Sequence, residues 1–177
     1  VVTKSAVQGA LLGAKGNSGV IISQWLRGFL EVFDGAEKAD GAKFSKAIQA
    51  AATTATNAIS DPKEGTIITV AEAAGKAVSM MEKQKCSLNN VLETAVTAAR
   101  NAAVETPKQM PLLEEAGVTD AGGEGLVLVL EGMLHSIKGN PLPASSICTG
   151  KINSDWLSKT ITKVEDHRFC TEFNVVG

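Results

Sequence analysis

Apolar side chains recur every three or four residues through most of the chain, which is the pattern of helices that bury one face. The stripes predict five helices, over residues 21–33, 44–59, 67–81, 88–103 and 126–137. Shorter helical stretches are expected over residues 3–12 and 111–116. Because the links are short, consecutive helices should run antiparallel. The pattern therefore predicts an all-α fold, as an antiparallel helical bundle or barrel.

Turn-forming residues mark several of the expected helix ends. Ser87 precedes the fourth stripe and is expected to cap its helix. Asp61-Pro62 ends the second stripe, and Pro107 follows the fourth and is expected to lie beyond its helix.

The helical pattern stops at Gly139-Asn140-Pro141. We expect residues 1–140 to form the helical domain, and residues 141–166 to be a linker with a possible short helix. Residues 167–177 contain a β-prone run and should begin a following domain. The chain starts and stops within patterned segments, so we expect it to be part of a longer protein, with the helical domain truncated at its N-terminus.

Composition narrows the class of protein. The 177 residues hold 17 Lys and Arg against 19 Asp and Glu, a net charge of −2, whereas nucleic-acid-binding proteins carry a strong basic excess. Nucleic acid is therefore not an expected partner. The longest apolar run, Leu126–Leu130, is too short for a transmembrane segment, and 3 cysteines do not suit a disulfide framework. We expect a globular, cytoplasmic protein.

Three glycine-bearing loops are the candidates for chemistry, because loops carry most binding residues. They are Gly13–Gly19, Asp61–Thr66 and Asp120–Gly125, and each directly precedes a helical stripe. The start of a helix offers unpaired N–H groups and the positive end of the helix dipole, which suit an anion. In an antiparallel bundle every second helix starts at the same end, so the three loops should meet there. The pattern thus indicates a phosphate or nucleotide site.

A second interpretation of these loops stays open. Gly, Asn, Ser, Asp and Pro also serve as ordinary helix punctuation, and each loop alone is a weak signal. The first loop matches neither the Walker pattern nor the dinucleotide fingerprint. Lys15 suits a phosphate or a solvated loop equally well, and His135 lies within a helical stripe, where packing residues lie. The residues alone assign no catalytic group and no metal ligand.

The three loops also carry a resemblance to a known family. The run Gly9–Gln24, which contains Gly-Ala-Lys-Gly-Asn-Ser-Gly, resembles the signature of the DhaL-like kinase domain. Pro62–Val70 resembles that family's second motif, and Leu112–Leu126 resembles its third. Cys170–Phe173 resembles the opening of the middle domain in the ATP-binding subunit of bacterial fatty acid kinase. Four motifs in order make the resemblance specific to this branch of the dihydroxyacetone kinase family.

The resemblance implies a helical barrel that holds ATP at one rim. The nucleotide-binding residues implied by it are Gly16, Asn17, Ser18, Gly19, Thr66, Asp120, Gly122 and Gly123. It also implies a kinase that phosphorylates a fatty acid presented by an acyl-binding partner protein, with an acyl phosphate as the product. A homodimer is a possible assembly, and Cys170 would match a metal-binding cysteine of the middle domain.

The chain departs from the family in one respect. The family holds Mg²⁺ with an aspartate loop before the first motif, and here no aspartate precedes Asp34. Phosphoryl transfer depends on Mg²⁺ bridging the phosphates, so we expect its ligands upstream of this chain and expect these residues alone to be inactive. Two alternatives remain: a kinase of the dihydroxyacetone type that acts on a small molecule, and a non-catalytic regulatory module that binds a nucleotide or a lipid.

Overall fold

A computed structural model describes residues 2–82 and 87–140 of the chain. Within these ranges the regular elements are all helices, so the predicted all-α fold is confirmed. They are α1 (Val2–Gly13), α2 (Gly16–Glu31), α3 (Gly41–Asn57), α4 (Ile67–Ser79), α5 (Leu88–Gln109), α6 (Pro111–Ala116) and α7 (Ala121–Lys138). None of these helices is both long enough and apolar enough to cross a membrane. The predicted linker over 141–166, the segment 167–177 and Cys170 lie outside the described residues.

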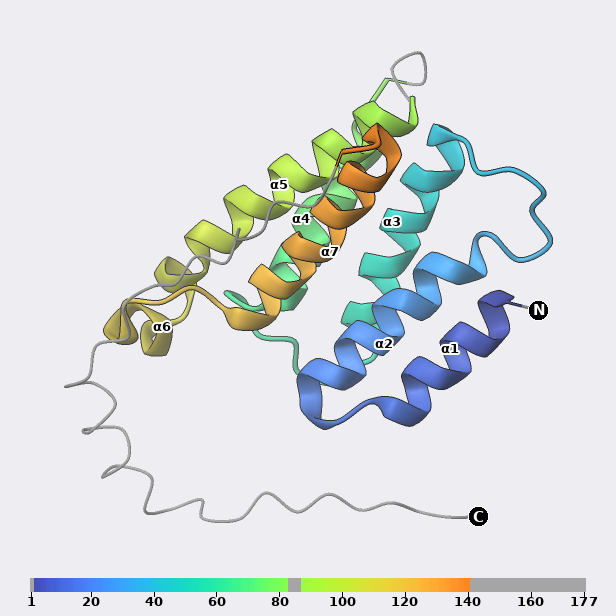
Figure 1. Ribbon diagram of the computed structural model, residues 1–177. Coiled ribbons are helices and arrows are strands. Elements are labelled where there is room, and N and C mark those ends of the chain that lie inside the picture. Colours follow the sequence, from blue (N-terminus) through green and yellow to red (C-terminus); the bar gives the residue numbers. More distant parts are fainter. Residues whose placement is uncertain (1, 83–86, 141–177) are drawn as a thin grey trace, which may run out of the picture.

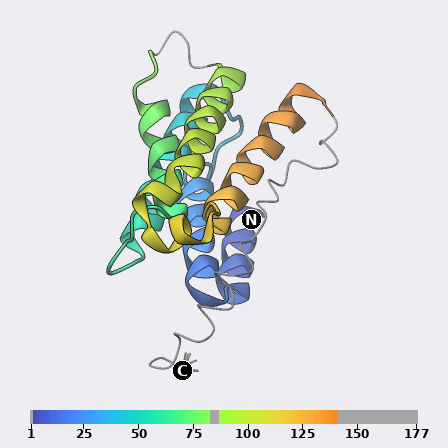
Figure 2. The same ribbon diagram turned by 90° about the vertical axis from the view of Figure 1, so that its left-hand side faces the viewer.

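Successive long helices run in alternating directions, as the short links predict. Figure 1 shows α2, α4 and α7 starting in the lower half of the view, and α3 and α5 starting in the upper half. Helix α3 packs between α2 and α4, and α5 packs on α4 and α7. Figure 2 shows α4 and α5 side by side, with α6 turning the chain at the end of α5. The starts of α2, α4 and α7 therefore lie at the same end of the bundle.

Alanine supplies much of the core. The fully buried alanines are Ala47, Ala51 and Ala55 of α3 and Ala95, Ala99 and Ala103 of α5. A methyl group adds little to the width of a helix, so these helices approach their neighbours closely. Larger side chains, among them Ile48, Leu92, Leu126 and Leu130, fill the remaining space and are also fully buried. The high alanine content is thus a packing requirement as well as a helix-forming one.

Helices α2 and α3 are held together by aromatic rings at one end and by a close backbone approach along their length. Trp25 stacks on Phe29 with ring centroids 5.3 Å apart, and Phe44 of α3 meets Phe29 edge-on at 5.4 Å. At Gly28 a Cβ atom would lie 2.5 Å from Thr54 Oγ1 and 2.6 Å from the Ala50 carbonyl oxygen. The spacing of the two helices therefore depends on a glycine at this position.

Helix α5 continues through Pro107 instead of ending before it, which corrects the expectation from the sequence. Proline has no N–H, so the carbonyl of Ala103, four residues earlier, loses its usual helical donor. The Thr106 hydroxyl donates to that carbonyl at 2.7 Å. The Met110 N–H then bonds the Thr106 carbonyl at 3.1 Å, which closes the last turn. The threonine side chain thus replaces the hydrogen bond that proline removes.

We predict that Gly28→Ala destabilises the protein by about 1–3 kcal/mol, because the added methyl group must push α2 and α3 apart. Gly125→Ala is the matched control, since a Cβ at this exposed helical position has no neighbour within 4 Å. That change should stabilise the fold by about 0.5–1 kcal/mol through the lower entropy of the unfolded chain. Urea denaturation of both variants measures the difference. Equal stability of the two would contradict the close approach at Gly28.

Candidate functional site

Residues from all three predicted loops surround one hollow of about 530 Å³, where α2, α4 and α7 begin. We call it the three-loop hollow. Its lining residues are Asn17, Ser18, Val20, Ile21, Ala58, Ile59, Ser60, Asp61, Pro62, Lys63, Thr66, Ile67, Ile68 and Asp120. Of the predicted site residues, Asn17, Ser18, Thr66 and Asp120 therefore come together around it. Gly16, Gly19, Gly122 and Gly123 do not line it.

The first predicted loop is the first turn of a helix. Helix α2 begins at Gly16, so Gly16–Gly19, which we expected before the helix, lies within it. The reason is the left-handed φ of +63° at Gly16, which lets the chain turn from α1 into α2 across two residues. Lys15, at the N-cap position, makes no side-chain hydrogen bond to this turn. The positive end of α2 thus reaches the hollow without a side-chain cap, beside Asn17 and Ser18.

The second loop is fixed by Gly65 and Thr66. Gly65 is buried with φ at +74°, and its N–H is shared between Gln109 Oε1 and Thr69 Oγ1, both at 3.0 Å. A Cβ at Gly65 would lie 2.9 Å from the Thr106 carbonyl oxygen, so the loop lies directly on the end of α5. The Thr66 hydroxyl donates to the Lys63 carbonyl at 2.7 Å and accepts from the Ile68 N–H at 3.3 Å. Thr66 thus caps α4 at the wall of the hollow.

The third loop places Asp120 at the hollow. The Asp120 carboxylate accepts from the Gly123 N–H at 2.7 Å, which caps α7. Gly122 and Gly123, expected in a loop, form part of the first turn of α7. A Cβ at Gly123 would lie 2.8 Å from Val70 Cγ2, so these glycines bring the start of α7 against α4. They shape the site by packing, and they do not line it.

An ion-pair group ties α7 to α5 on the side of the third loop. Arg100 of α5 donates to Glu124 at 2.8 Å and to Glu131 at 2.5 Å, and all three side chains are partly buried. Partial burial strengthens such pairs relative to exposed ones, because water screens them less. Glu124 lies in the first turn of α7, so the pair fixes the rotation of the turn that carries Gly122 and Gly123.

The last turn of α5, Thr106–Met110, holds two of the three loops, and the sequence reasoning did not single it out. Thr106 is fully buried, and its hydroxyl accepts from the Asp120 N–H at 3.0 Å. Gln109 accepts from the Gly65 N–H of the second loop, as described above. A threonine directly before a proline, just after a helical stripe, was the available signal, because such a hydroxyl can donate to a nearby backbone carbonyl. No sequence signal marks Gln109.

The charges at the hollow are mixed. Lys63 and Asp61 form an exposed ion pair at 2.5 Å, and Asp120 adds a partly buried carboxylate. Across residues 2–82 and 87–140, no three His, Cys, Asp or Glu side chains gather closely enough to hold a metal ion. The described residues line the hollow with two carboxylates, those of Asp61 and Asp120. They do offer amide, hydroxyl and ammonium groups beside a helix start, which are the groups that bind phosphate.

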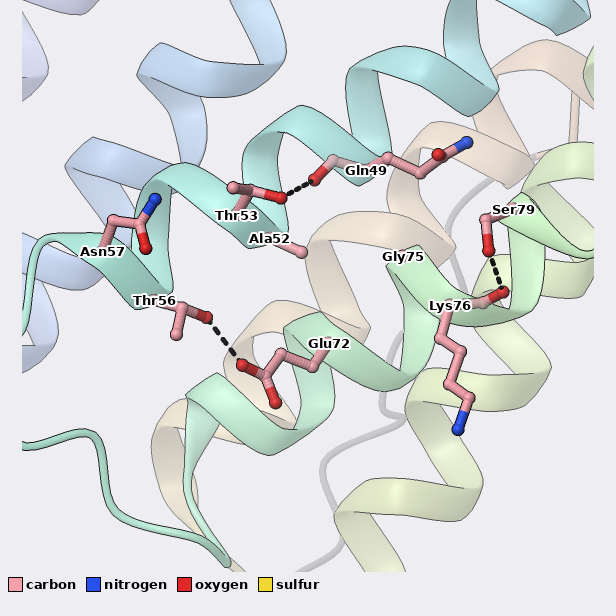
Figure 3. A pocket seen from close by; sticks show the side chains of 9 residues that line it. All are labelled: Gln49, Ala52, Thr53, Thr56, Asn57, Glu72, Gly75, Lys76 and Ser79. Atoms are coloured by element: carbon pink, nitrogen blue, oxygen red, sulfur yellow. Dashed lines mark hydrogen bonds between the residues drawn. The ribbon is translucent and has the colours of Figure 1, made fainter.

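A second hollow of about 440 Å³ lies between α3 and α4 (Figure 3). Polar side chains line it, and the Thr56 hydroxyl donates to Glu72 across it at 2.9 Å. Gly75 and Ala52 form its floor, where a Cβ at Gly75 would lie 3.1 Å from the Ala52 methyl. It contains none of the predicted site residues, and its walls are the sides of two helices. Of these two hollows, only the three-loop hollow lies at the start of a helix, where an anion is favoured.

The sequence matches a known family of domains over most of its length. The pattern that describes the DAK2 domain matches residues 1–135. The chain belongs to the DAK2 domain family. This is the family of ATP-binding, DhaL-type kinase domains, so the resemblance that the three loops carry is confirmed at the level of the domain.

The DAK2 domain is part of much longer proteins in the relatives that it matches. Protein YloV of Bacillus subtilis is 40% identical over 141 residues, which are 79% of this chain and 25% of the relative. An uncharacterized protein of Staphylococcus epidermidis is 36% identical over 177 residues, covering 97% of this chain and 32% of the relative. The chain thus spans about a quarter to a third of these curated relatives.

We predict that Asp120→Ala lowers the free energy of unfolding of this DAK2 domain by about 1 kcal/mol, because the Gly123 N–H loses its cap. Asp120→Asn should cost much less, since an asparagine oxygen also caps a helix. Chemical denaturation monitored by circular dichroism measures both variants. An equal loss in both would mean that the carboxylate charge, and not the capping bond, is what stabilises the start of α7.

Proposed function

We propose that this DAK2 domain binds ATP in the three-loop hollow. The phosphates lie across the first turn of α2, Gly16–Gly19, and Thr66 and Asp120 lie near the nucleotide. Gly122 and Gly123 act at the same site by keeping the start of α7 against α4. The observation that carries the proposal is the meeting of Asn17, Ser18, Thr66 and Asp120 around one hollow.

Physical considerations favour the start of α2 as the phosphate end. The helices α4 and α7 are capped by the side chains of Thr66 and Asp120, whereas α2 has no side-chain cap. The first-turn amides of α2 are therefore the ones free of a competing side-chain acceptor, and the helix dipole adds to their attraction for an anion. The Asp120 carboxylate repels the negative charge of phosphate. It therefore suits the ribose or base of the nucleotide, or a phosphate whose charge is neutralised, better than free phosphate oxygens.

We propose further that the full-length protein is a fatty acid kinase. A carboxylate oxygen of the fatty acid, presented by an acyl-binding partner protein, attacks the γ-phosphorus of ATP. The bond from this phosphorus to the β–γ bridging oxygen breaks, ADP leaves, and an acyl phosphate forms. Mg²⁺ supplies charge neutralisation when it is bound. Its ligands are expected outside these residues, in the aspartate loop that the resemblance to the family implies. The role of Asn17, Ser18 and Thr66 is to position the phosphates.

We predict that Asn17→Ala weakens Mg·ATP binding by the full-length protein about 3- to 10-fold, the loss of one hydrogen bond to a charged ligand. Thr66→Ala should weaken it similarly, because the second loop and the start of α4 lose the hydroxyl that orders them at the hollow, and Thr66→Ser should not. Isothermal titration calorimetry measures the affinities. Gln49→Ala is the matched control, because Gln49 lines the hollow between α3 and α4 and not the three-loop hollow. Weaker binding in the Gln49 variant alone would move the nucleotide to the other hollow.

The phosphoryl acceptor is tested by measuring ADP release from the full-length protein with three additions: a fatty acid loaded on its acyl-binding protein, dihydroxyacetone, or neither. We expect ADP release only with the loaded protein, and a hydroxylamine-reactive acyl phosphate as product. Release with dihydroxyacetone would assign the small-molecule kinase instead. ATP binding without transfer to either acceptor would favour a regulatory module.

A further inference from the structure

We propose that Thr106 is a positioning residue for the nucleotide site, and that the last turn of α5 sets the second and third loops as one unit. The proposal deepens the proposed function and rests on it. Thr106 lines neither hollow and lies outside the four motifs on which the resemblance was based. It acts through Asp120 and Gly65, which it holds from the buried side.

The bonding of the Thr106 hydroxyl defines its role. The hydroxyl donates to the Ala103 carbonyl at 2.7 Å and accepts from the Asp120 N–H at 3.0 Å, and the side chain is fully buried. Its single proton is committed to the carbonyl that Pro107 leaves without a helical donor, so a lone pair faces Asp120. The proline therefore fixes the orientation of the hydroxyl, and the hydroxyl fixes the backbone of Asp120.

The same turn of α5 also holds the second loop. The backbone of Gly65 lies against Thr106, Gln109 and Met110, close enough that a Cβ at Gly65 would be 2.9–3.1 Å from their atoms. Gln109 adds a hydrogen bond to the Gly65 N–H. Gly65 directly precedes Thr66, and Asp120 directly precedes α7. A displacement of this turn therefore moves Thr66 and Asp120 together.

The coupling is tested in the full-length protein by substitutions at two positions, Thr106 and Gln109. Thr106→Val keeps the shape and removes the hydroxyl, and we expect it to weaken Mg·ATP binding at least ~10-fold, while Thr106→Ser stays within about 2-fold. Gln109→Met changes an exposed side chain and should weaken binding about 3-fold. Thr97→Val is the matched control, because Thr97 lies on an exposed part of α5 and donates only to the Glu93 carbonyl.

Amide hydrogen exchange gives a readout that does not need ATP. Removing the Thr106 hydroxyl should accelerate exchange at Asp120, its direct partner, and also at Gly65, whose N–H it does not bond. Gln109→Met should likewise accelerate exchange at both amides. The amide of Leu92, in the buried middle of α5, serves as the reference for global opening. Faster exchange at Gly65 and Asp120 relative to Leu92 supports a shared unit.

The outcomes separate this inference from the function that it deepens. Wild-type protein that binds no ATP would overturn the proposed function, and the exchange data would still decide the coupling. The inference would be overturned if a folded Thr106→Val protein bound ATP with unchanged affinity and showed only a lower melting temperature. Thr106 would then be a structural residue. If Thr106→Val does not fold, Gln109→Met decides: acceleration at Gly65 alone, with Asp120 unchanged, contradicts a shared unit.

Discussion

One hydrogen bond, from the Thr106 hydroxyl to the Ala103 carbonyl that Pro107 leaves without a helical donor, determines the geometry on which the second and third loops depend. The proline takes an amide away from the helix, and the threonine hydroxyl supplies the missing donor. The helix can therefore extend by a further turn, and this turn supports both Gly65 and Asp120. Without the extra turn, the second and third loops would lose their shared support on α5, and their separation would rest on the packing of the start of α7 against α4.

Small side chains provide the second constraint. Gly28 sets the distance between α2 and α3, and Gly123 sets the distance between α7 and α4. Buried alanines along α3 and α5 allow the same closeness in the middle of the bundle. Because each contact fixes one helix relative to the next, the three helix starts are placed by packing along the whole length of the bundle. The hollow is a consequence of this packing and of the links between the helices.

Much of this structure follows from the sequence, because helical periodicity and capping are local. The stripes at 44–59 and 67–81 and the cap at Ser87 correspond to α3, α4 and the start of α5. The meeting of the three loops was also predicted, because every second helix of an antiparallel bundle starts at the same end. Reasoning from neighbouring residues failed at Pro107. The helical hydrogen bond that proline removes is replaced by the Thr106 hydroxyl, whose other partner, Asp120, is distant in sequence. Such reasoning also missed Gln109, since an exposed glutamine becomes informative only when the partner loop is in place.

The three walls of the hollow differ in how firmly the fold holds them. None of the residues of α1 is buried, and the first wall is the exposed first turn of α2, which follows this helix after a short connection. The other two walls rest on α5, whose alanine face is wholly enclosed. Transient local opening is easiest where few apolar contacts must be broken. A visiting molecule would therefore meet two rigid sides and one compliant side, so adaptation to its shape would fall on the exposed first turn of α2 and the connection before it.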